Sequence, residues 1–345
     1  MKSSLISSAI DKIRSIESGY ENLIKEYSVK HGRKIIASPC FFILPEINSA
    51  FNIVTVKIPE FILNETSCND ILSSLYDAVI IPEKECFCSK GFSSTITTHV
   101  FKTPAGFGED AAVFLHNEIS LMLKTLFNIE IKSINIETLQ RETSTYEKLR
   151  RLVRSISSLR SENKTLLSNS ELSLIFETAL ILPPEIAVEY ITPVLEGMKN
   201  ITETIDKTAV HGMLYGGKSI PSVIADSIEE SGILLVEDDS CTGRRLFDIS
   251  LNAESEYIFY EILDAYSYRA LSPCLRPVNE RYELLYKLLR NYNIDTVIFF
   301  KDKNCNESVK DIDYLRIKMM RDGIDPLVID ENNYHQIISD YISKI

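Results

Sequence analysis

The chain has 345 residues, of which 45% are hydrophobic and 25% are charged, and its formal net charge is −12. This length favours two domains, and the composition is that of a soluble globular protein. The negative charge argues against nucleic acid and anionic membranes as partners. No apolar run reaches the roughly 18 residues of a membrane span, and the N-terminal segment is amphipathic, so we expect a cytoplasmic protein.

The first part of the chain alternates between helical and strand patterns. Apolar residues recur at helical spacing over about 4–28, which predicts helix there. Short apolar runs follow, and they predict strands at 35–36, 53–56, 78–81 and 96–101. This part of the chain therefore indicates an α/β domain.

A long helical stretch occupies the middle of the chain. Asn135 is a candidate N-cap for a helix through Arg160, and Ser170 is a candidate N-cap for the next helix. Two prolines, Pro183 and Pro184, are expected to end that second helix. The stretch would join two α/β halves, which places the domain boundary near residue 205.

The C-terminal part shows a cleaner alternation of elements. Strands are expected at 212–215, 233–237, 296–300 and 327–329, and helices at about 220–231, 254–271, 279–292, 307–321 and 333–343. Strands that alternate with helices favour a parallel, doubly wound sheet. The sequence thus predicts an α/β protein with two doubly wound parallel-sheet domains of the Rossmann or flavodoxin-like type, 1–205 and 206–345, joined by a helical segment.

Cysteines follow several of the predicted strands. Cys86 and Cys88 come after the strand at 78–81, and Cys305 comes after the strand at 296–300. Open α/β sheets bind ligands at the carboxyl ends of their strands, so these thiols could converge in one crevice between the halves. Thiols gathered without histidines suit an iron–sulfur cluster or a soft metal, and the alternative for each is burial as a small apolar side chain. The five histidines are scattered, which disfavours a zinc site.

A second pattern offers a different interpretation. Residues 212–219 fit the bare motif of a phosphate-binding P-loop, with Lys218 and Ser219 at its end. The first residues of this stretch read as a strand, whereas a P-loop needs them as a loop after a strand. A strand followed by a tight glycine turn is therefore the favoured interpretation.

One predicted strand runs directly into Asp238, Asp239, Cys241 and Gly243. Residues 236–244 resemble the V-x-D-D-x-C-T-G-x-R segment of the family of 2-hydroxyacyl-CoA dehydratase and benzoyl-CoA reductase subunits, of the D-component type. Other segments are similar to this family in the same order, at 32–46, 77–86, 269–277, 295–305 and 323–330.

The resemblance implies an oxygen-sensitive iron–sulfur cluster, most commonly 4Fe–4S, held by three cysteines. Carried onto this chain, the ligands fall on Cys68, Cys86 and Cys305, with Cys88 as a rival for the second position. The resemblance also implies a homologous second subunit, in a heterodimer or a homodimer, and a separate ATP-dependent activator that delivers one electron. The implied substrate is a 2-hydroxyacyl-CoA, which loses hydroxide through a ketyl radical and becomes an enoyl-CoA.

Four further residues gain a role by the same resemblance. Asp238, Asp239 and Gly243 would shape the strand-end turn near the cofactor, and Glu46 would act in proton transfer. Each has an ordinary alternative, because Asp and Gly serve in caps and turns, and a Glu near a helix start often only caps or forms a salt bridge.

The chain departs from the family pattern at several positions. Where the family has Asp after the second cysteine, this chain has Phe87, or Ser89 if Cys88 is the ligand. Asn306 stands after the third cysteine, and the segment at 48–52 differs. These departures leave two alternatives open. The chain could be a non-catalytic electron-transfer subunit of such a complex, or a subunit of a benzoyl-CoA reductase or double-cubane-type reductase.

Overall fold

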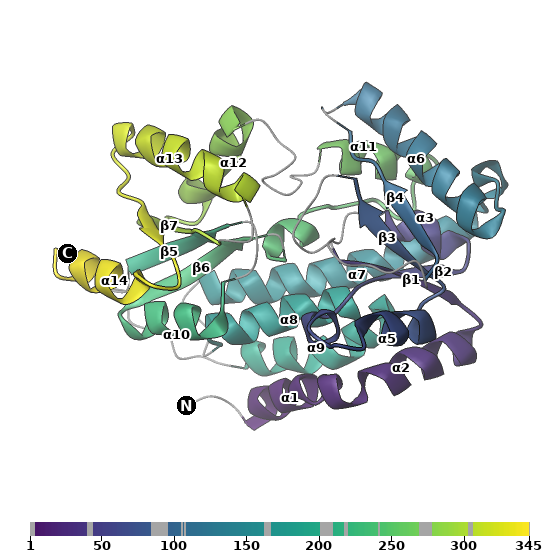
Figure 1. Ribbon diagram of the computed structural model, residues 1–345, viewed down its shortest axis with the longest axis horizontal. Coiled ribbons are helices and arrows are strands. Elements are labelled where there is room, and N and C mark those ends of the chain that lie inside the picture. The colour runs from purple at the N-terminus through teal and green to yellow at the C-terminus, as the bar shows by residue number, and fades with distance from the viewer. Residues whose placement is uncertain are drawn as a thin grey trace.

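The computed structural model of the chain describes residues 4–39, 44–83, 96–104, 106, 108–161, 167–200, 210–216, 220–240, 242–268, 278–302 and 306–344. Within these residues the strands form two four-stranded sheets, and each sheet is parallel throughout. The two sheets lie on opposite sides of the molecule, and the long helices run across its middle (Figure 1).

The first sheet has the strand order β2-β1-β3-β4. Its strands are β1 (Lys34–Ser38), β2 (Ile53–Lys57), β3 (Ala78–Pro82) and β4 (Thr98–Phe101). Alternate residues of β1 enter different apolar clusters, with Ile35 in one and Ile36 in the other, so both faces of the sheet are covered. The carboxyl ends of all four strands lie at one edge, because neighbouring strands are parallel.

The second sheet has the order β6-β5-β7-β8, which repeats the arrangement of the first. Its strands are β5 (Val210–Tyr215), β6 (Ile233–Asp239), β7 (Thr296–Phe300) and β8 (Leu327–Ile329). Helices separate these strands in sequence, as parallel pairing requires. The predicted α/β fold with two doubly wound parallel sheets is therefore confirmed.

Helices fill the sequence between and around the strands. Those that precede or flank the first sheet are α1 (Ser4–Arg14), α2 (Ile16–His31), α3 (Pro45–Ala50), α4 (Glu60–Leu63), α5 (Cys68–Leu75) and α6 (Glu109–Phe127). A short turn, η2 (Ile131–Ser133), leads to the central helices α7 (Ile136–Ser161), α8 (Asn169–Ile181) and α9 (Pro184–Lys199). The later elements are α10 (Ser222–Glu230), the turn η3 (Arg244–Phe247), α11 (Ile258–Tyr268), α12 (Val278–Asn291), α13 (Asn306–Arg321) and α14 (Tyr334–Ile342).

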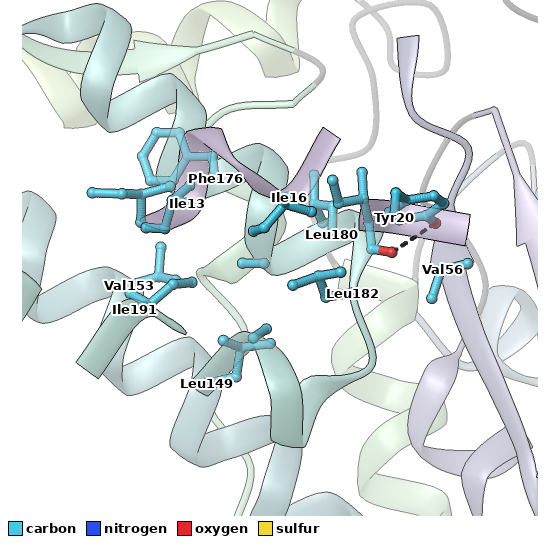
Figure 2. Packing of buried hydrophobic residues seen from close by; sticks show 14 of the residues in the cluster. Ile13, Ile16, Tyr20, Val56, Leu149, Val153, Phe176, Leu180, Leu182 and Ile191 are labelled. Atoms are coloured by element: carbon cyan, nitrogen blue, oxygen red, sulfur yellow. Dashed lines mark hydrogen bonds between the residues drawn. The ribbon is translucent and has the colours of Figure 1, made fainter. Parts of the chain in front are cut away.

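The largest apolar core lies beneath the first sheet, where the N-terminal and central helices meet. Figure 2 shows part of it, with Ile13 of α1 beside Phe176 of α8 and on the same side as Val153 and Ile191, while Tyr20 lies at the opposite side of the view, toward Val56 of β2. The Tyr20 hydroxyl stays satisfied because it donates to the carbonyl oxygen of Ile181 at 3.0 Å.

Three local predictions can be compared with the helix ends. The helical region over 4–28 is two helices, α1 and α2, rather than a continuous one. Asn135 caps α7 as expected, since its Oδ1 accepts from the amide of Thr138 at 2.8 Å. The predicted cap at Ser170 is wrong. Ser168 is the N-cap of α8, because only there can Glu171 complete a capping box by bonding back to the Ser168 amide.

Helix α7 connects the two sheets. Its last turn carries Arg160, which is fully buried, donates to the carbonyl oxygen of Leu235 in β6 and pairs with Glu229 of α10. In the opposite direction, residues 249–266 return to the first sheet, where Ile262 and its neighbours pack beneath α6. The domain boundary near residue 205 stays a prediction, and by packing α11 belongs with the first sheet.

The structure contradicts the P-loop interpretation for residues 212–215, because these residues form a strand and not a loop. Gly212 lies in the middle of β5, and a Cβ placed there would come within 2.7 Å of the Ile233 side chain. The start of the motif is therefore a tightly packed strand, as the favoured interpretation requires. Residues 217–219 lie outside the described part of the chain.

No helix in the described part of the chain combines the length and the apolar character needed to cross a membrane.

Candidate functional site

Glu46 lies at the start of α3, the short helix that follows β1. Its side chain is fully buried, and residues from distant parts of the chain bind both of its carboxylate oxygens. Arg150 of α7 forms an ion pair with Oε1, and the Tyr266 hydroxyl of α11 donates to Oε2 at 3.0 Å. Glu46 thus ties three elements together, and its part in proton transfer stays a prediction.

Arg150 connects Glu46 to a second buried carboxylate. Its Nε lies 2.8 Å from Oε1 of Glu147, which also accepts from the amide of Leu251 at 3.1 Å. Burial lowers the pKa of Arg150, but the charges of Glu46, Tyr266 and Glu147 outweigh that effect and hold the pKa above its usual value. The guanidinium is therefore a permanent cation between two carboxylates.

The same network continues along α7 towards the second sheet. Arg154 lies 3.4 Å from Oε2 of Glu147. Its Nη1 donates to the carbonyl oxygens of Phe247 and Ile249, each at 2.6 Å. A path of polar contacts therefore runs along α7 from the end of β1 to the end of η3, which lies just past the turn after β6.

Asp238 and Asp239 form the last two residues of β6. The sequence placed them just past a strand that ends at 237, and that placement is wrong, because both still pair with β5 opposite Leu214 and Tyr215. Asp238 accepts from the amide of Ser240 at 2.8 Å, which starts the turn. Both carboxylates are therefore buried at the carboxyl edge of the second sheet.

Burial dominates the electrostatics of these two carboxylates. It raises the pKa of Asp238, although the bond from Ser240 works in the opposite direction. Burial also raises the pKa of Asp239 to about 6, even though Arg245 lies 2.7 Å from its Oδ1. A carboxyl group that titrates near neutral pH at a strand end suits a site where protonation states change. Their role in cofactor binding stays a prediction.

Glu237 is a buried carboxylate that the sequence interpretation missed. Burial raises its pKa to about 8, despite its ion pair with Arg244. Arg244 also lies 3.4 Å from Asp248 and stacks over the ring of Tyr292, 4.5 Å from its centroid. The sequence offered one signal for this pair, namely an acidic residue at the end of an apolar run and seven positions before an arginine.

Gly243 shapes the turn after β6 by its lack of a side chain. A Cβ at this position would come within 2.3 Å of the carbonyl oxygen of Asp238 and 2.8 Å of its Oδ1. The Gly243 amide donates to the carbonyl oxygen of Ser240 at 3.2 Å and closes the turn. Asp238 and Gly243 thus both take part in this turn, and their role near a cofactor stays a prediction.

Cys68 is the first residue of α5, the helix that leads into β3. A helix that connects two parallel strands runs antiparallel to them, so it begins on the side of the strand carboxyl ends. The thiol is partly exposed and packs against the apolar core. Burial raises the pKa of the thiol, so a metal ion would have to displace its proton to bind there.

The other expected thiol ligands, Cys86, Cys88 and Cys305, lie outside the described residues. Among the residues that the structure describes, no group of three or more His, Cys, Asp or Glu side chains could hold a metal ion. Cys68 by itself has the donor chemistry of an iron–sulfur ligand, namely a soft sulfur atom partly shielded by apolar neighbours. A cluster bound through Cys68 would therefore need its other ligands from outside the described part of the chain, and the cluster itself stays a prediction.

The chain is similar to known proteins in three comparisons. The family model of the 2-hydroxyglutaryl-CoA dehydratase D-component matches residues 60–336. The (R)-phenyllactyl-CoA dehydratase beta subunit of Clostridium sporogenes is 20% identical over 235 residues, which are 65% of this chain and 60% of that subunit's length. A Mn-bound periplasmic metal binding protein variant from Candidatus Liberibacter asiaticus has 9% identity over 90% of this chain and 98% of its own, with a TM-score of 0.24, which is too low to inform fold or site.

Proposed function

The chain belongs to the family of the 2-hydroxyglutaryl-CoA dehydratase D-component, and from this premise we propose that it is the iron–sulfur subunit of a dehydratase-type enzyme. The reaction would convert a 2-hydroxyacyl-CoA to an enoyl-CoA after one-electron activation by an ATP-dependent activator. The observation that carries the proposal is the family match over 60–336, because this range includes the predicted ligand positions and the turn after β6.

The expected cofactor is an iron–sulfur cluster, with 4Fe–4S as the proposed type. Cys68, Cys305 and either Cys86 or Cys88 would hold it. When bound, such a cluster would supply one-electron chemistry and a Lewis-acidic iron. The turn that Asp238 and Gly243 form would line the same region, if the carboxyl edges of both sheets serve one site.

Glu46 would contribute proton transfer from the end of β1. Its Oε2 is the atom at which a proton would be held or moved, because Oε1 is engaged by the permanent cation of Arg150. The Tyr266 hydroxyl is the group already in contact with Oε2. The acyl group of the substrate is not part of the proposal, since the named relative is 20% identical and the match spans 60% of its length.

A second candidate function is that of an electron-transfer subunit with no reaction of its own. Full burial of Glu46 and the contacts on both its oxygens favour this candidate, because such an arrangement also describes a purely structural ion pair. A third alternative is a subunit of a benzoyl-CoA reductase or double-cubane-type reductase. A homologous second subunit is proposed in each case.

Cysteine substitutions test the ligand assignment. In protein purified without oxygen, Cys68→Ser and Cys305→Ser should each lose most of the iron, because each removes a ligand. The matched control is Cys274→Ser, which should retain the iron because the resemblance does not place Cys274 among the ligands. One of Cys86→Ser and Cys88→Ser should lose iron and so identify the second ligand. Equal iron content in all five variants would contradict a cysteine-held cluster.

Addition of a 2-hydroxyacyl-CoA distinguishes the catalytic from the relay role. In a catalytic subunit the thioester should change the EPR signal and raise the apparent stability by mass action. A relay subunit should show neither effect, while the partner subunit responds. A thioester-dependent signal from this chain alone would rule out the relay role.

A further inference from the structure

The described part of the chain exposes a group of large apolar side chains on two adjacent helices, α6 and α11. Each of these side chains is between 53% and 70% exposed. They are Val113 and Leu121 of α6, Tyr257 directly before α11, and Tyr260 and Tyr268 of α11. We call this surface the α6–α11 face. Apolar groups gathered in this way on a soluble protein usually mark an interaction site.

The two helices form one continuous surface. They are packed against each other, and in Figure 1 they lie together at the upper right. The rings of His116 in α6 and Phe259 in α11 meet edge to face, with centroids 5.9 Å apart. At the other end, a Cβ on Gly108 would lie 3.3 Å from the Tyr268 hydroxyl. The tyrosines therefore belong to a single face that begins at the start of α6.

The charge on this surface is mainly negative, and the lysine of α6, Lys124, is paired with Glu130. Residues 246–268 contain five acidic residues and no Lys or Arg, and α6 begins with two more acidic residues. Five exposed carboxylates on the face form no ion pair with any described residue, and they are Glu109, Asp110, Glu254, Glu256 and Asp264. An exposed aromatic surface with unpaired carboxylates is complementary to arginine and lysine, which pair with the acids and stack on tyrosine rings.

The negative charge of the α6–α11 face also limits which partners can bind there. The face would repel a phosphate-bearing ligand such as an acyl-CoA or a nucleic acid. A second copy of this chain, placed with the same face inwards, would bring the unpaired carboxylates together at a considerable cost. Charged residues are depleted from the cores of permanent interfaces, so a face with this many unpaired acids suits a partner that binds and leaves.

One end of the α6–α11 face lies on the same side of the first sheet as the carboxyl ends of its strands. β4 ends at Phe101, whose carbonyl oxygen accepts from the amide of Glu83 after β3 at 3.0 Å. The segment that follows β4 leads to Gly108 and α6, so the Tyr268 end of the face lies on the side of the strand carboxyl ends of the first sheet. In sequence, Cys86 and Cys88 follow β3, and they lie outside the described residues.

We propose that the α6–α11 face is the docking surface for a separate, basic protein that binds transiently. Within the proposed function, on which this assignment of the partner rests, that protein is the ATP-dependent activator. Tyr257, Tyr260 and Tyr268 supply the apolar contact, and the surrounding carboxylates attract and orient the basic face of the activator.

The test measures the affinity of the activator protein for the full chain, purified without oxygen and holding its iron. Tyr257→Ser combined with Tyr260→Ser should weaken binding by roughly tenfold or more, as the loss of aromatic contacts at an interface centre does. Glu256→Lys combined with Asp264→Lys should weaken it and also flatten its dependence on salt. Wild-type affinity should fall steeply between low and high NaCl concentrations.

Two control variants match these changes on other surfaces. Tyr314→Ser alters a tyrosine of α13 that is 47% exposed, and Glu26→Lys reverses an exposed charge on α2. Both should leave the affinity within about twofold of wild type, as surface changes away from an interface do. An effect of the controls equal to that of the face variants would overturn the proposal.

Three further results would overturn the docking proposal. The first is unchanged activator affinity in the face variants. The second is that the face variants release the homologous second subunit in a sedimentation measurement while activator binding persists, because the face would then be a subunit interface. The third is an iron-replete wild-type chain that fails to bind the activator. Failure of the proposed function is distinguishable, since it would show as a chain that holds no iron.

Discussion

At the end of β1, the buried carboxylate of Glu46 is bound by Arg150 and Tyr266, which lie 104 and 220 residues further along the chain. At the end of β6, Glu237 and Asp239 pair with arginines that follow within seven residues. The first network fastens three distant elements together, whereas the second stabilises one turn. The network at Glu46 is therefore a long-range one, and the network at Glu237 and Asp239 is a local one.

The two regions also differ in how they respond to protons. Arg150 is a permanent cation that holds two carboxylates at the first site. At the second site, burial raises the pKa of Asp239 to about 6 and that of Glu237 to about 8, so these groups titrate near neutral pH. The first site is accordingly a fixed scaffold, and the second is the part of the pair where protonation can change.

Removal of Arg150 should have the largest effect on stability. Arg150→Met leaves Glu46 buried without its cation and removes one of the two arginines beside Glu147, which should reduce the free energy of unfolding by about 3–5 kcal/mol in a urea titration. Arg141→Met on the same helix removes an arginine whose side chain is 66% exposed, and it should cost less than about 1 kcal/mol. Similar losses in the two variants would contradict a long-range scaffold at Glu46.

A substitution at Gly243 tests the local turn. Gly243→Ala should reduce the free energy of unfolding by about 1–3 kcal/mol, because the added Cβ meets the backbone of Asp238. The control is Gly19→Ala in α2, where a Cβ meets nothing within 4 Å. It should raise the stability by about 0.5–1 kcal/mol through better helix propensity. Effects of the same sign at both positions would refute the close approach at Gly243.

The sequence was most informative where structure is local. The strands at 296–300 and 327–329 were predicted with the bounds of β7 and β8, because each is a short apolar run between polar turns. The turn with Asp238 and Gly243 was recognised for the same reason. The end of β6 was placed too early, since Asp238 and Asp239 are polar and only their pairing with β5 keeps them in the sheet.

Contacts between distant elements could not be predicted from the sequence. Nothing in the spacing of residues links Glu46 to Tyr266, because the contact depends on α11 returning to the first sheet. The N-cap of α8 was missed for a smaller reason. Ser168 and Ser170 are both good caps, and the choice depends on Glu171 lying three positions after the first.

The pH dependence of stability should distinguish the second site from the first. A carboxyl group with a raised pKa holds a proton in the folded state that the unfolded chain has released, so it favours folding at low pH and this contribution is lost as the pH rises. For Glu237 the window runs from its ordinary pKa of 4.5 to about 8.

Glu237→Gln should therefore flatten the decline in unfolding free energy between about pH 5 and pH 8, where one proton is worth at most about 1.4 kcal/mol per pH unit. The exposed carboxylate of Glu21 on α2 provides the control, and Glu21→Gln should leave the slope unchanged. A wild-type slope that persists in Glu237→Gln would show that another group titrates in this window.

The cap of α8 gives the smallest expected effect. Ser168→Ala removes the hydroxyl that accepts from the amide of Glu171 and should cost about 1 kcal/mol in thermal or chemical unfolding. Ser170→Ala keeps that bond and should change the stability by less than half as much. The reverse order would restore the cap that the sequence alone suggested.

The central claim is that this chain carries an iron–sulfur cluster, and iron and sulfide analysis of the full chain, purified without oxygen, tests it most directly. The account predicts brown protein with about four iron and four sulfide per chain, as a cubane held by thiolates would give. Colourless protein that stays free of iron after anaerobic reconstitution would contradict the account.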